Sequence, residues 1–72
     1  MEWRNFTFYG LGLIGGSLAK AIRKYYPSAR ISAIEKNPYA VACAKKEGIL
    51  NRELYNASEI EEDTDILFLC AP

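Results

Sequence analysis

Residues 6–15 read Phe-Thr-Phe-Tyr-Gly-Leu-Gly-Leu-Ile-Gly, and they carry the strongest structural signal in the sequence. Its first four residues are β-branched or aromatic and stop at Gly10, which indicates a strand that ends in a glycine turn. From Leu13 apolar residues recur at helical spacing, and Pro27 ends the pattern. The recurring residues are Ile14, Leu18, Ala21, Ile22 and Tyr25. The stretch therefore predicts a strand, a glycine turn and a helix.

The next segments repeat this alternation. The segment 30–35 is short, largely apolar and free of glycine, as is typical of a buried parallel strand. Asn37 followed by Pro38 is typical of a helix start, and the helix is expected to run to about Glu47, with Gly48 as its stop. We expect its small residues to pack closely on a sheet; they are Ala40, Val41, Cys43 and Ala44.

The last part of the chain is harder to interpret. Leu54 and Tyr55 indicate a short third strand, and Ser58 with Glu61 three residues later indicates a capping box for one helical turn. Residues 66–70 form a continuous apolar run, which is typical of a strand covered on both faces. Together the segments predict a parallel α/β sheet with flanking helices.

Composition limits the class of protein. The chain has 72 residues, of which 50% are hydrophobic and 25% charged, so it forms one small domain or part of one. A formal net charge of zero argues against binding nucleic acid or an anionic membrane through global basic charge. Histidine is absent, which excludes imidazole chemistry and histidine-ligated metal sites. No apolar run approaches the roughly 20 residues of a membrane-spanning helix.

Charge is unevenly distributed along the chain. Residues 1–52 carry nine basic and three acidic side chains, whereas residues 53–72 carry six acidic and no basic ones. This asymmetry could guide an anion toward the first part, but solvated helix faces are the preferred interpretation of the basic residues. Those residues are Lys20, Arg23, Lys24, Lys45 and Lys46.

The two cysteines, Cys43 and Cys70, are too few for a disulfide scaffold and lack the spacing of a redox or zinc motif. We expect reduced, buried thiols in a cytoplasmic protein. Cys70 is expected in the core rather than as a nucleophile, because the chain has no histidine to activate it.

Residues 10–15 match the pattern G-x-G-x-x-G between the first strand and the first helix, and Glu35 lies twenty residues after Gly15, at the end of the second strand. This combination is the signature of a dinucleotide site in a Rossmann-type sheet. Gly10 would allow the tight turn, Gly12 would let the backbone approach a pyrophosphate, and Gly15 would let the helix lie close on the sheet. A glycine-rich turn kept only for close packing is the alternative.

The helix start would face the phosphates with its unpaired N–H groups, and Leu11, Leu13 and Ile14 would supply backbone there. No catalytic or metal-binding residue is expected in the chain.

Glu35 would accept hydrogen bonds from the adenosine ribose hydroxyls, and its charge would repel a 2′-phosphate, so NAD is expected rather than NADP. Lys36 beside it keeps NADP as the alternative. Ala71 and Pro72 follow the last strand and either border the nicotinamide side of the cofactor or only end the strand.

Residues 10–19, Gly-Leu-Gly-Leu-Ile-Gly-Gly-Ser-Leu-Ala, resemble the opening of prephenate and arogenate dehydrogenases, and so do the Glu47-Gly48-Ile49 turn and residues 65–72. The resemblance covers nearly the whole chain but only the first part of the family's cofactor domain. It has two departures: Glu35 stands where the family commonly has aspartate, and the family's substrate-binding and catalytic part is missing.

The resemblance implies oxidation and decarboxylation of prephenate by NAD to 4-hydroxyphenylpyruvate, carbon dioxide and NADH, in tyrosine biosynthesis. It further implies that residues 1–72 are the N-terminal part of a dinucleotide-binding domain, truncated after the fourth strand. The family's catalytic histidine and arginines, and the helical region through which it forms homodimers, would lie in a longer protein. The chain alone is then expected to be inactive and cytoplasmic.

Other functions remain open from the sequence. One is a non-catalytic module that binds a dinucleotide or S-adenosylmethionine, and another is the cofactor domain of a different dehydrogenase, such as a hydroxyacid dehydrogenase or an imine reductase. If the sheet lacks helices on its second face, residues 66–69 are expected to form an exposed apolar patch that favours self-association.

Overall fold

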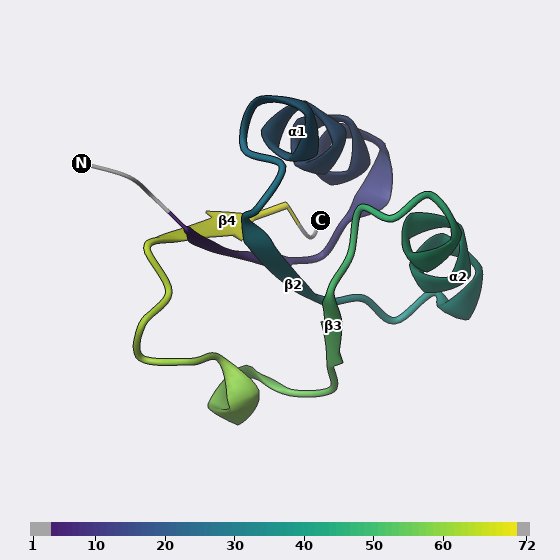
Figure 1. The fold of residues 1–72 in the computed structure, drawn as a ribbon. Coiled ribbons are helices and arrows are strands. Elements are labelled where there is room, and N and C mark those ends of the chain that lie inside the picture. The colour runs from purple at the N-terminus through teal and green to yellow at the C-terminus, as the bar shows by residue number, and fades with distance from the viewer. Residues whose placement is uncertain (1–3, 71–72) are drawn as a thin grey trace.

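The computed structural model describes residues 4–70, apart from the side chain of Leu13. Strands and helices alternate along most of the chain (Figure 1). The elements are β1 (Asn5–Tyr9), α1 (Gly12–Tyr25), β2 (Arg30–Ile34), α2 (Pro38–Lys46), β3 (Arg52–Leu54), a 3₁₀ turn η1 (Ala57–Glu59) and β4 (Ile66–Leu69).

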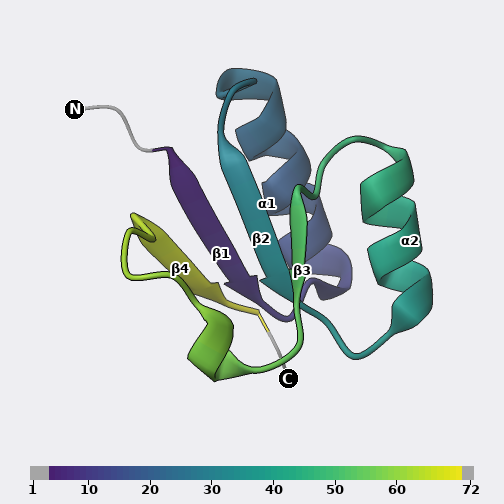
Figure 2. The same cartoon turned by 60° about the horizontal axis from the view of Figure 1, so that its bottom comes forward.

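The four strands form one sheet in the order β3-β2-β1-β4, and every neighbouring pair is parallel. Both helices lie on one side of the sheet, and the segment that joins β3 to β4 runs on the other side (Figure 1; Figure 2). The chain order thus reverses between β1 and β4, which makes this pair of strands the topological switch point of the sheet. The predicted Rossmann-type parallel α/β sheet with flanking helices is confirmed.

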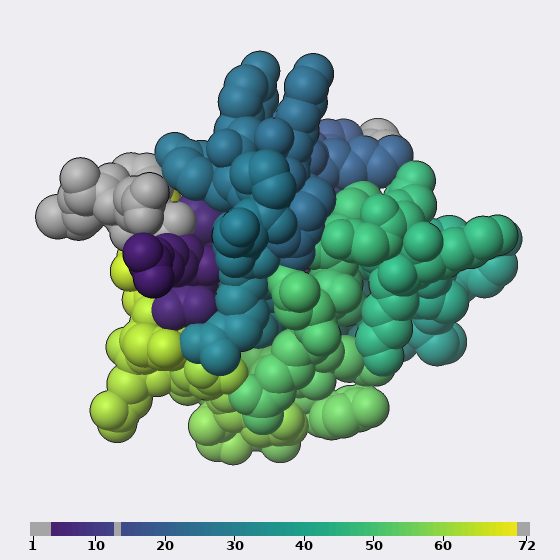
Figure 3. Space-filling view, viewed as in Figure 1, coloured from purple at the N-terminus to yellow at the C-terminus, as the bar shows by residue number. Residues whose placement is uncertain are grey.

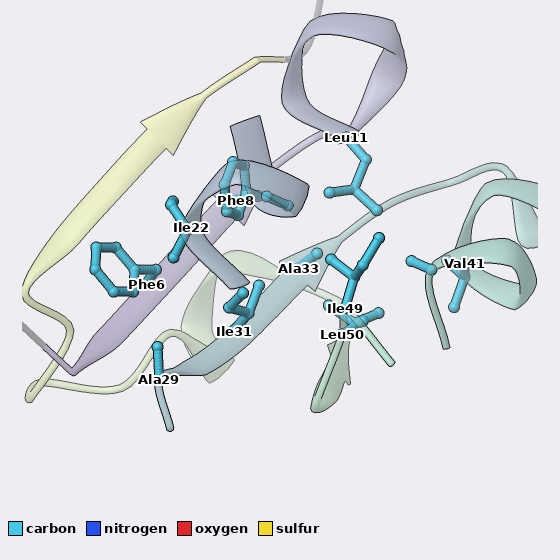
Figure 4. Packing of buried hydrophobic residues seen from close by; sticks show 12 residues of the cluster. Phe6, Phe8, Leu11, Ile22, Ala29, Ile31, Ala33, Val41, Ile49 and Leu50 are labelled. Carbon is cyan, nitrogen blue, oxygen red and sulfur yellow. The ribbon is translucent and has the colours of Figure 1, made fainter. Parts of the chain in front are cut away.

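The core lies between the sheet and the two helices (Figure 4). Phe6 and Phe8 of β1 point to this side, and Phe8 stacks on Phe68 of β4 with ring centroids 4.8 Å apart. On β2 the same side carries Ile31 and Ala33, both fully buried. Burial of these side chains removes apolar surface from water, and this is the main force that holds the helices on the sheet.

The apolar face of α1 agrees only in part with the one that the helical spacing predicted. Ile14, Ala21 and Tyr25 are exposed, whereas Ala19 and Ile22 are buried. The close contact at Gly15 fixes the stripe 15, 19 and 22 against the sheet and turns Ile14, Ala21 and Tyr25 outward, whereas Leu18 is half-buried and packs against the core.

The second face of the sheet has a different cover. Thr7 and Ser32 are buried there, and the hydroxyl oxygens of Thr7 and Thr64 lie 3.0 Å apart, within hydrogen-bond distance. The segment between β3 and β4 spreads over the lower side of the molecule in the space-filling view (Figure 3). Asp65 anchors its end, because one carboxylate oxygen accepts hydrogen bonds from the backbone N–H groups of Arg4 (2.7 Å) and Asn5 (2.8 Å).

This cover does not reach the outer part of β4. Ile66 and Phe68 pack against the core, but Leu67 and Leu69 on the other face are 44% and 76% exposed. The prediction of a strand covered on both faces is therefore wrong for β4 in this chain, whereas the expected apolar patch is present at Leu67 and Leu69.

Three local predictions are corrected by the structure. The cap of the turn η1 is Asn56, whose side chain accepts the backbone N–H of Ser58, and Ser58 is not the capping residue. The third strand is Arg52–Leu54 rather than Leu54 and Tyr55. Cys43 is exposed, because it lies on the outer side of α2, while Val41 and Ala44 face the sheet.

Arg23 is a fourth correction, because it is not a solvated residue of a helix face. Its guanidinium donates hydrogen bonds to the carbonyl oxygens of Pro27 (2.9 Å), Ala29 (2.7 Å) and Ile49 (3.0 Å). It also reaches the side-chain oxygen of Asn51. Arg23 therefore ties the end of α1 to the loops before β2 and β3.

Candidate functional site

A cleft of about 530 Å³ lies at the carboxyl ends of β1, β2 and β4. It is lined by Tyr9, Gly10, Gly12, Ile34, Glu35, Lys36 and Cys70. In open parallel sheets this edge, next to the switch point, is where ligands bind. The topology therefore brings together residues from three segments that are distant in the sequence.

The glycine turn between β1 and α1 forms one wall of this cleft. Gly10 and Gly12 have φ angles of 87° and 53°, a backbone region that residues with a side chain rarely adopt. The N–H of Gly10 donates to the carbonyl of Ile34 at 2.7 Å, so the turn is fastened to the end of β2. The sharp reversal predicted at Gly10 is present.

Gly12 and Gly15 have different surroundings. A β-carbon at Gly15 would lie 3.1 Å from the carbonyl oxygen of Gly10 and 3.2 Å from the β-carbon of Cys70, so glycine lets α1 lie close on the sheet. A β-carbon at Gly12 would meet no atom within 4 Å, and Gly12 faces the cleft. The close packing predicted for Gly15 is present, and the space beside Gly12 is open.

The start of α1 presents backbone N–H groups rather than side chains. Leu11 precedes the helix, and its hydrocarbon side chain, which is buried in the core, offers no acceptor for a capping hydrogen bond. No residue of the first turn is acidic, and Ile14 is 78% exposed. The first N–H groups of a helix have no partner within the helix, and together with the helix dipole they attract an anion.

Glu35 follows β2 and lies beside this turn. Its Oε1 accepts a hydrogen bond from the N–H of Leu11 at 2.7 Å, and its Oε2 accepts one from the N–H of Asn37 at 2.9 Å. These backbone donors, Asn37 first and Leu11 second, lower the pKa of the Glu35 carboxyl below its usual value, while partial desolvation opposes the shift. The carboxyl group is therefore ionised and fixed in orientation at neutral pH.

Four further residues belong to the predicted set. Lys36 is exposed and lines the cleft next to Glu35. Of Leu13 only the backbone is described, within α1. Ala71 and Pro72, for which the sequence leaves two roles open, lie outside the described residues.

Tyr9 and Cys70 also line the cleft, and the sequence interpretation did not include them. The N–H of Cys70 donates to the carbonyl of Tyr9 at 3.0 Å, which extends the pairing of β1 and β4 beyond the last strand residues. The signal that could have found both is position, because each stands at the carboxyl end of a strand next to the switch point.

Within residues 4–70 no cluster of histidine, cysteine, aspartate and glutamate is suited to hold a metal ion. None of the helices in that part of the chain is long and apolar enough to cross a membrane.

No protein-family model matches the chain. Among solved structures, the chain is similar to prephenate dehydrogenase from A. aeolicus, crystallised in complex with hydroxyphenyl propionate and NAD⁺. The match has a TM-score of 0.82 and 26% sequence identity, and it covers 100% of this chain and 26% of that one. This chain therefore spans about a quarter of the length of that dehydrogenase. The similarity to prephenate dehydrogenase that the sequence indicates is thus confirmed by the structure over the whole chain.

Proposed function

We propose that this chain binds NAD in the cleft at the carboxyl ends of β1, β2 and β4. The observation that carries the proposal is the open space beside Gly12, at the start of a helix whose N-cap residue, Leu11, makes no side-chain hydrogen bond to the first turn. A pyrophosphate needs such a close approach to backbone N–H groups, which a β-carbon would block. The solved dehydrogenase with the similar fold was crystallised with NAD⁺, which supports the same ligand class here.

The cleft residues have separate roles in this proposal. Gly10 and Gly15 shape the turn, while the backbone of Leu11, Leu13 and Ile14 surrounds the pyrophosphate at the start of α1. This arrangement uses N–H groups, so no basic side chain has to touch the phosphates.

In this proposal Glu35 and Lys36 lie beside the adenosine ribose and discriminate between NAD and NADP. Glu35 accepts hydrogen bonds from the ribose hydroxyls, and its negative charge disfavours the 2′-phosphate of NADP. Lys36 is the cation that would partly offset this repulsion. Ala71 and Pro72 are assigned to the nicotinamide side, because they follow β4 in the sequence and β4 ends at the same edge of the sheet as β1 and β2.

We further propose that residues 1–72 are the N-terminal part of a dinucleotide-binding domain in an oxidoreductase of the prephenate or arogenate dehydrogenase type. Bound NAD would supply the hydride acceptor. The role of this chain is to bind and orient the dinucleotide, since it has no histidine to act as the catalytic group that the resemblance implies. Substrate binding, catalysis and homodimer formation are assigned to other parts of a longer protein.

Calorimetric titration with NAD and NADP tests the proposed binding. Gly12→Ala places a methyl group toward the cleft and also strains a positive φ angle. Gly48→Ala is a matched control, because Gly48 has a φ of 71°, open space around its α-carbon and a place at the end of α2, outside the cleft lining. Each substitution is expected to cost about 1–2 kcal/mol of folding free energy.

We expect only Gly12→Ala to weaken NAD binding, by roughly tenfold or more, which corresponds to about 1.4 kcal/mol. Circular dichroism would establish that both variants are folded at the titration temperature. Equal affinities in both variants, or no NAD binding by the folded parent chain, would refute the proposal.

A further inference from the structure

The carboxylate of Glu35 joins the starting points of both helices. Leu11 directly precedes α1 and Asn37 directly precedes α2, and each donates its backbone N–H to a different oxygen of Glu35. The two hydrogen bonds measure 2.7 Å and 2.9 Å. A single side chain after β2 therefore connects the glycine turn to the start of α2.

The two helices depend on this carboxylate to different degrees. The helix α2 has its own cap, because the side-chain oxygen of Asn37 accepts the N–H of Tyr39 at 2.9 Å. The helix α1 has no side-chain cap of its own and no acidic residue in its first turn. Glu35 thus accepts, from a distant point in the sequence, the backbone N–H of the N-cap residue Leu11, the bond that a Glu or Gln in the first turn makes in a capping box.

The glycine turn has a particular need for such a contact. Glycine is the least conformationally restricted residue type, so it loses the most backbone entropy on folding. Folding therefore carries an entropy cost at Gly10 and Gly12, both of which are held at positive φ. The N–H of Gly10 is fixed by the carbonyl of Ile34, and the N–H of the next residue, Leu11, is fixed by Glu35. Consecutive N–H groups of the turn are therefore both held by the end of β2.

We propose that Glu35 is a positioning residue, which holds the glycine turn and the start of α1 in the conformation that receives an anion, in addition to any contact with ribose hydroxyls. This inference deepens the proposed dinucleotide binding and rests on it for the identity of the anion. The hold on the turn itself is a property of the unliganded chain, so it can be tested separately.

Electrostatics and positioning predict opposite signs for the loss of Glu35. If the carboxylate only contacted ribose, its removal would leave the affinity for inorganic pyrophosphate unchanged, or raise it because a negative charge has gone from beside the helix start. If the carboxylate positions the turn, its removal lowers the affinity for pyrophosphate, which has no ribose to contact. Pyrophosphate is therefore the probe that separates the two roles.

Two substitutions separate the length and the charge of the side chain. Glu35→Gln keeps the length but offers an acceptor to only one of the two N–H groups, since the other oxygen becomes an NH₂ donor. Glu35→Asp keeps the charge but is one methylene shorter, so it cannot span both N–H groups. Glu62→Gln is the control, because it makes the same charge change at an exposed residue that does not line the cleft.

The first measurement follows amide hydrogen exchange and amide proton shifts by nuclear magnetic resonance in the unliganded chain. The other ionisable side chains that line the cleft, Tyr9, Lys36 and Cys70, contain no carboxyl group. If the amide proton shifts of Leu11 and Asn37 change together at acidic pH, the change therefore reports protonation of Glu35. We expect this titration in the parent and in Glu62→Gln, and exchange at residues 10–14 at least fivefold faster in both Glu35 variants.

The second measurement is a phosphorus resonance titration with inorganic pyrophosphate. We expect a three- to tenfold lower affinity in both Glu35 variants than in Glu62→Gln, although Glu35→Asp retains the charge. Unchanged exchange at residues 10–14, or pyrophosphate affinity equal to or above that of the control, would overturn the positioning role. If the folded parent bound neither NAD nor pyrophosphate but showed the expected exchange differences, the dinucleotide proposal would fail and the hold of Glu35 on the turn would stand.

Discussion

Gly15 of α1 faces Cys70 so closely that a β-carbon on the glycine would lie 3.2 Å from the β-carbon of the cysteine. The same added atom would lie 3.1 Å from the carbonyl oxygen of Gly10, which is part of the backbone and cannot rotate away. The helix, the glycine turn and the residue after β4 thus meet at one point beside the cleft. The absence of a side chain at residue 15 sets the distance between α1 and the switch point of the sheet.

This contact predicts opposite effects for two neighbouring glycines. Gly15→Ala should destabilise the chain by about 1 kcal/mol, because overpacking of roughly 1–3 kcal/mol outweighs the gain in helix propensity. Gly16→Ala, whose β-carbon would meet nothing within 4 Å, should stabilise it by about 0.5–1 kcal/mol. Urea unfolding followed by circular dichroism measures both. Two variants of equal stability would contradict the close contact at Gly15.

Arg23 is expected to contribute strongly to stability although it lies in a helix with other basic residues. Arg23→Lys keeps the charge but cannot reach the three carbonyl oxygens and Asn51 together, and we expect a loss of about 2 kcal/mol or more. Lys24→Gln is the control, because Lys24 is the next residue of the same helix and is exposed. Its Nζ lies over the Tyr25 ring, 5.9 Å from the centroid, which is a weak contact at an exposed site. Thermal unfolding that shows similar losses for the two variants would refute this role of Arg23.

Acid should weaken the fold through Asp65. The backbone N–H groups of Asn5 and Arg4 lower the pKa of the Asp65 carboxyl below its ordinary value of 3.8. The unfolded chain then binds the proton more tightly, so the stabilisation is present above pH 3.8 and is lost as the pH falls through the lower, folded-state pKa.

Asp65→Asn should therefore flatten the decline of stability below about pH 4.5. Urea midpoints at pH 7 and at several acidic pH values test this, with Glu62→Gln as the control. A variant whose stability falls with acid as steeply as the parent would show that Asp65 is not responsible.

The exposed leucines of β4 should promote self-association of this chain. Leu67 and Leu69 lie on an edge strand of four apolar residues without a charge, whereas the opposite edge, β3, carries Arg52 and Glu53. Uncharged apolar edges are prone to pair with other molecules. Leu69→Lys should lower the average mass at high concentration, measured by sedimentation equilibrium.

Tyr39→Lys is the control for this prediction, because Tyr39 is 78% exposed but lies at the start of α2, away from β4. The same substitutions should differ in binding of a hydrophobic dye, which Leu69→Lys alone reduces. A parent chain that stays monomeric at every concentration and binds no dye would contradict the prediction.

The choice between NAD and NADP should depend on the two adjacent residues after β2. Lys36→Ala should weaken NADP binding more than NAD binding, by roughly three- to tenfold, because it removes a cation near the 2′-phosphate. Lys46→Ala, in the last turn of α2, is the control. S-Adenosylmethionine should not compete with NADH. Exclusive binding of S-adenosylmethionine would favour the methyl-donor alternative and refute the NAD proposal.

The sequence alone determined the parts of the structure that depend on neighbouring residues. Residues 6–10 predict β1 and its glycine turn, Asn37 and Pro38 predict the start of α2, and Gly48 predicts its end. These signals are local, because strand propensity, helix capping and positive φ angles act within a few residues. The position of Glu35 beside the turn also followed, since parallel strands end at one edge of a sheet.

Only the tertiary structure decided which partners these residues have. The apolar spacing predicts that Ile14 lies on the buried face of α1. In the structure Gly15 faces Cys70 instead, and Ile14 is exposed. Glu35 meets the N–H of Leu11, 24 residues earlier, and Arg23 meets Asn51, 28 residues later. Local periodicity carries no information on such pairs, because they arise only when the packing of α1 on the sheet fixes the distances between distant segments.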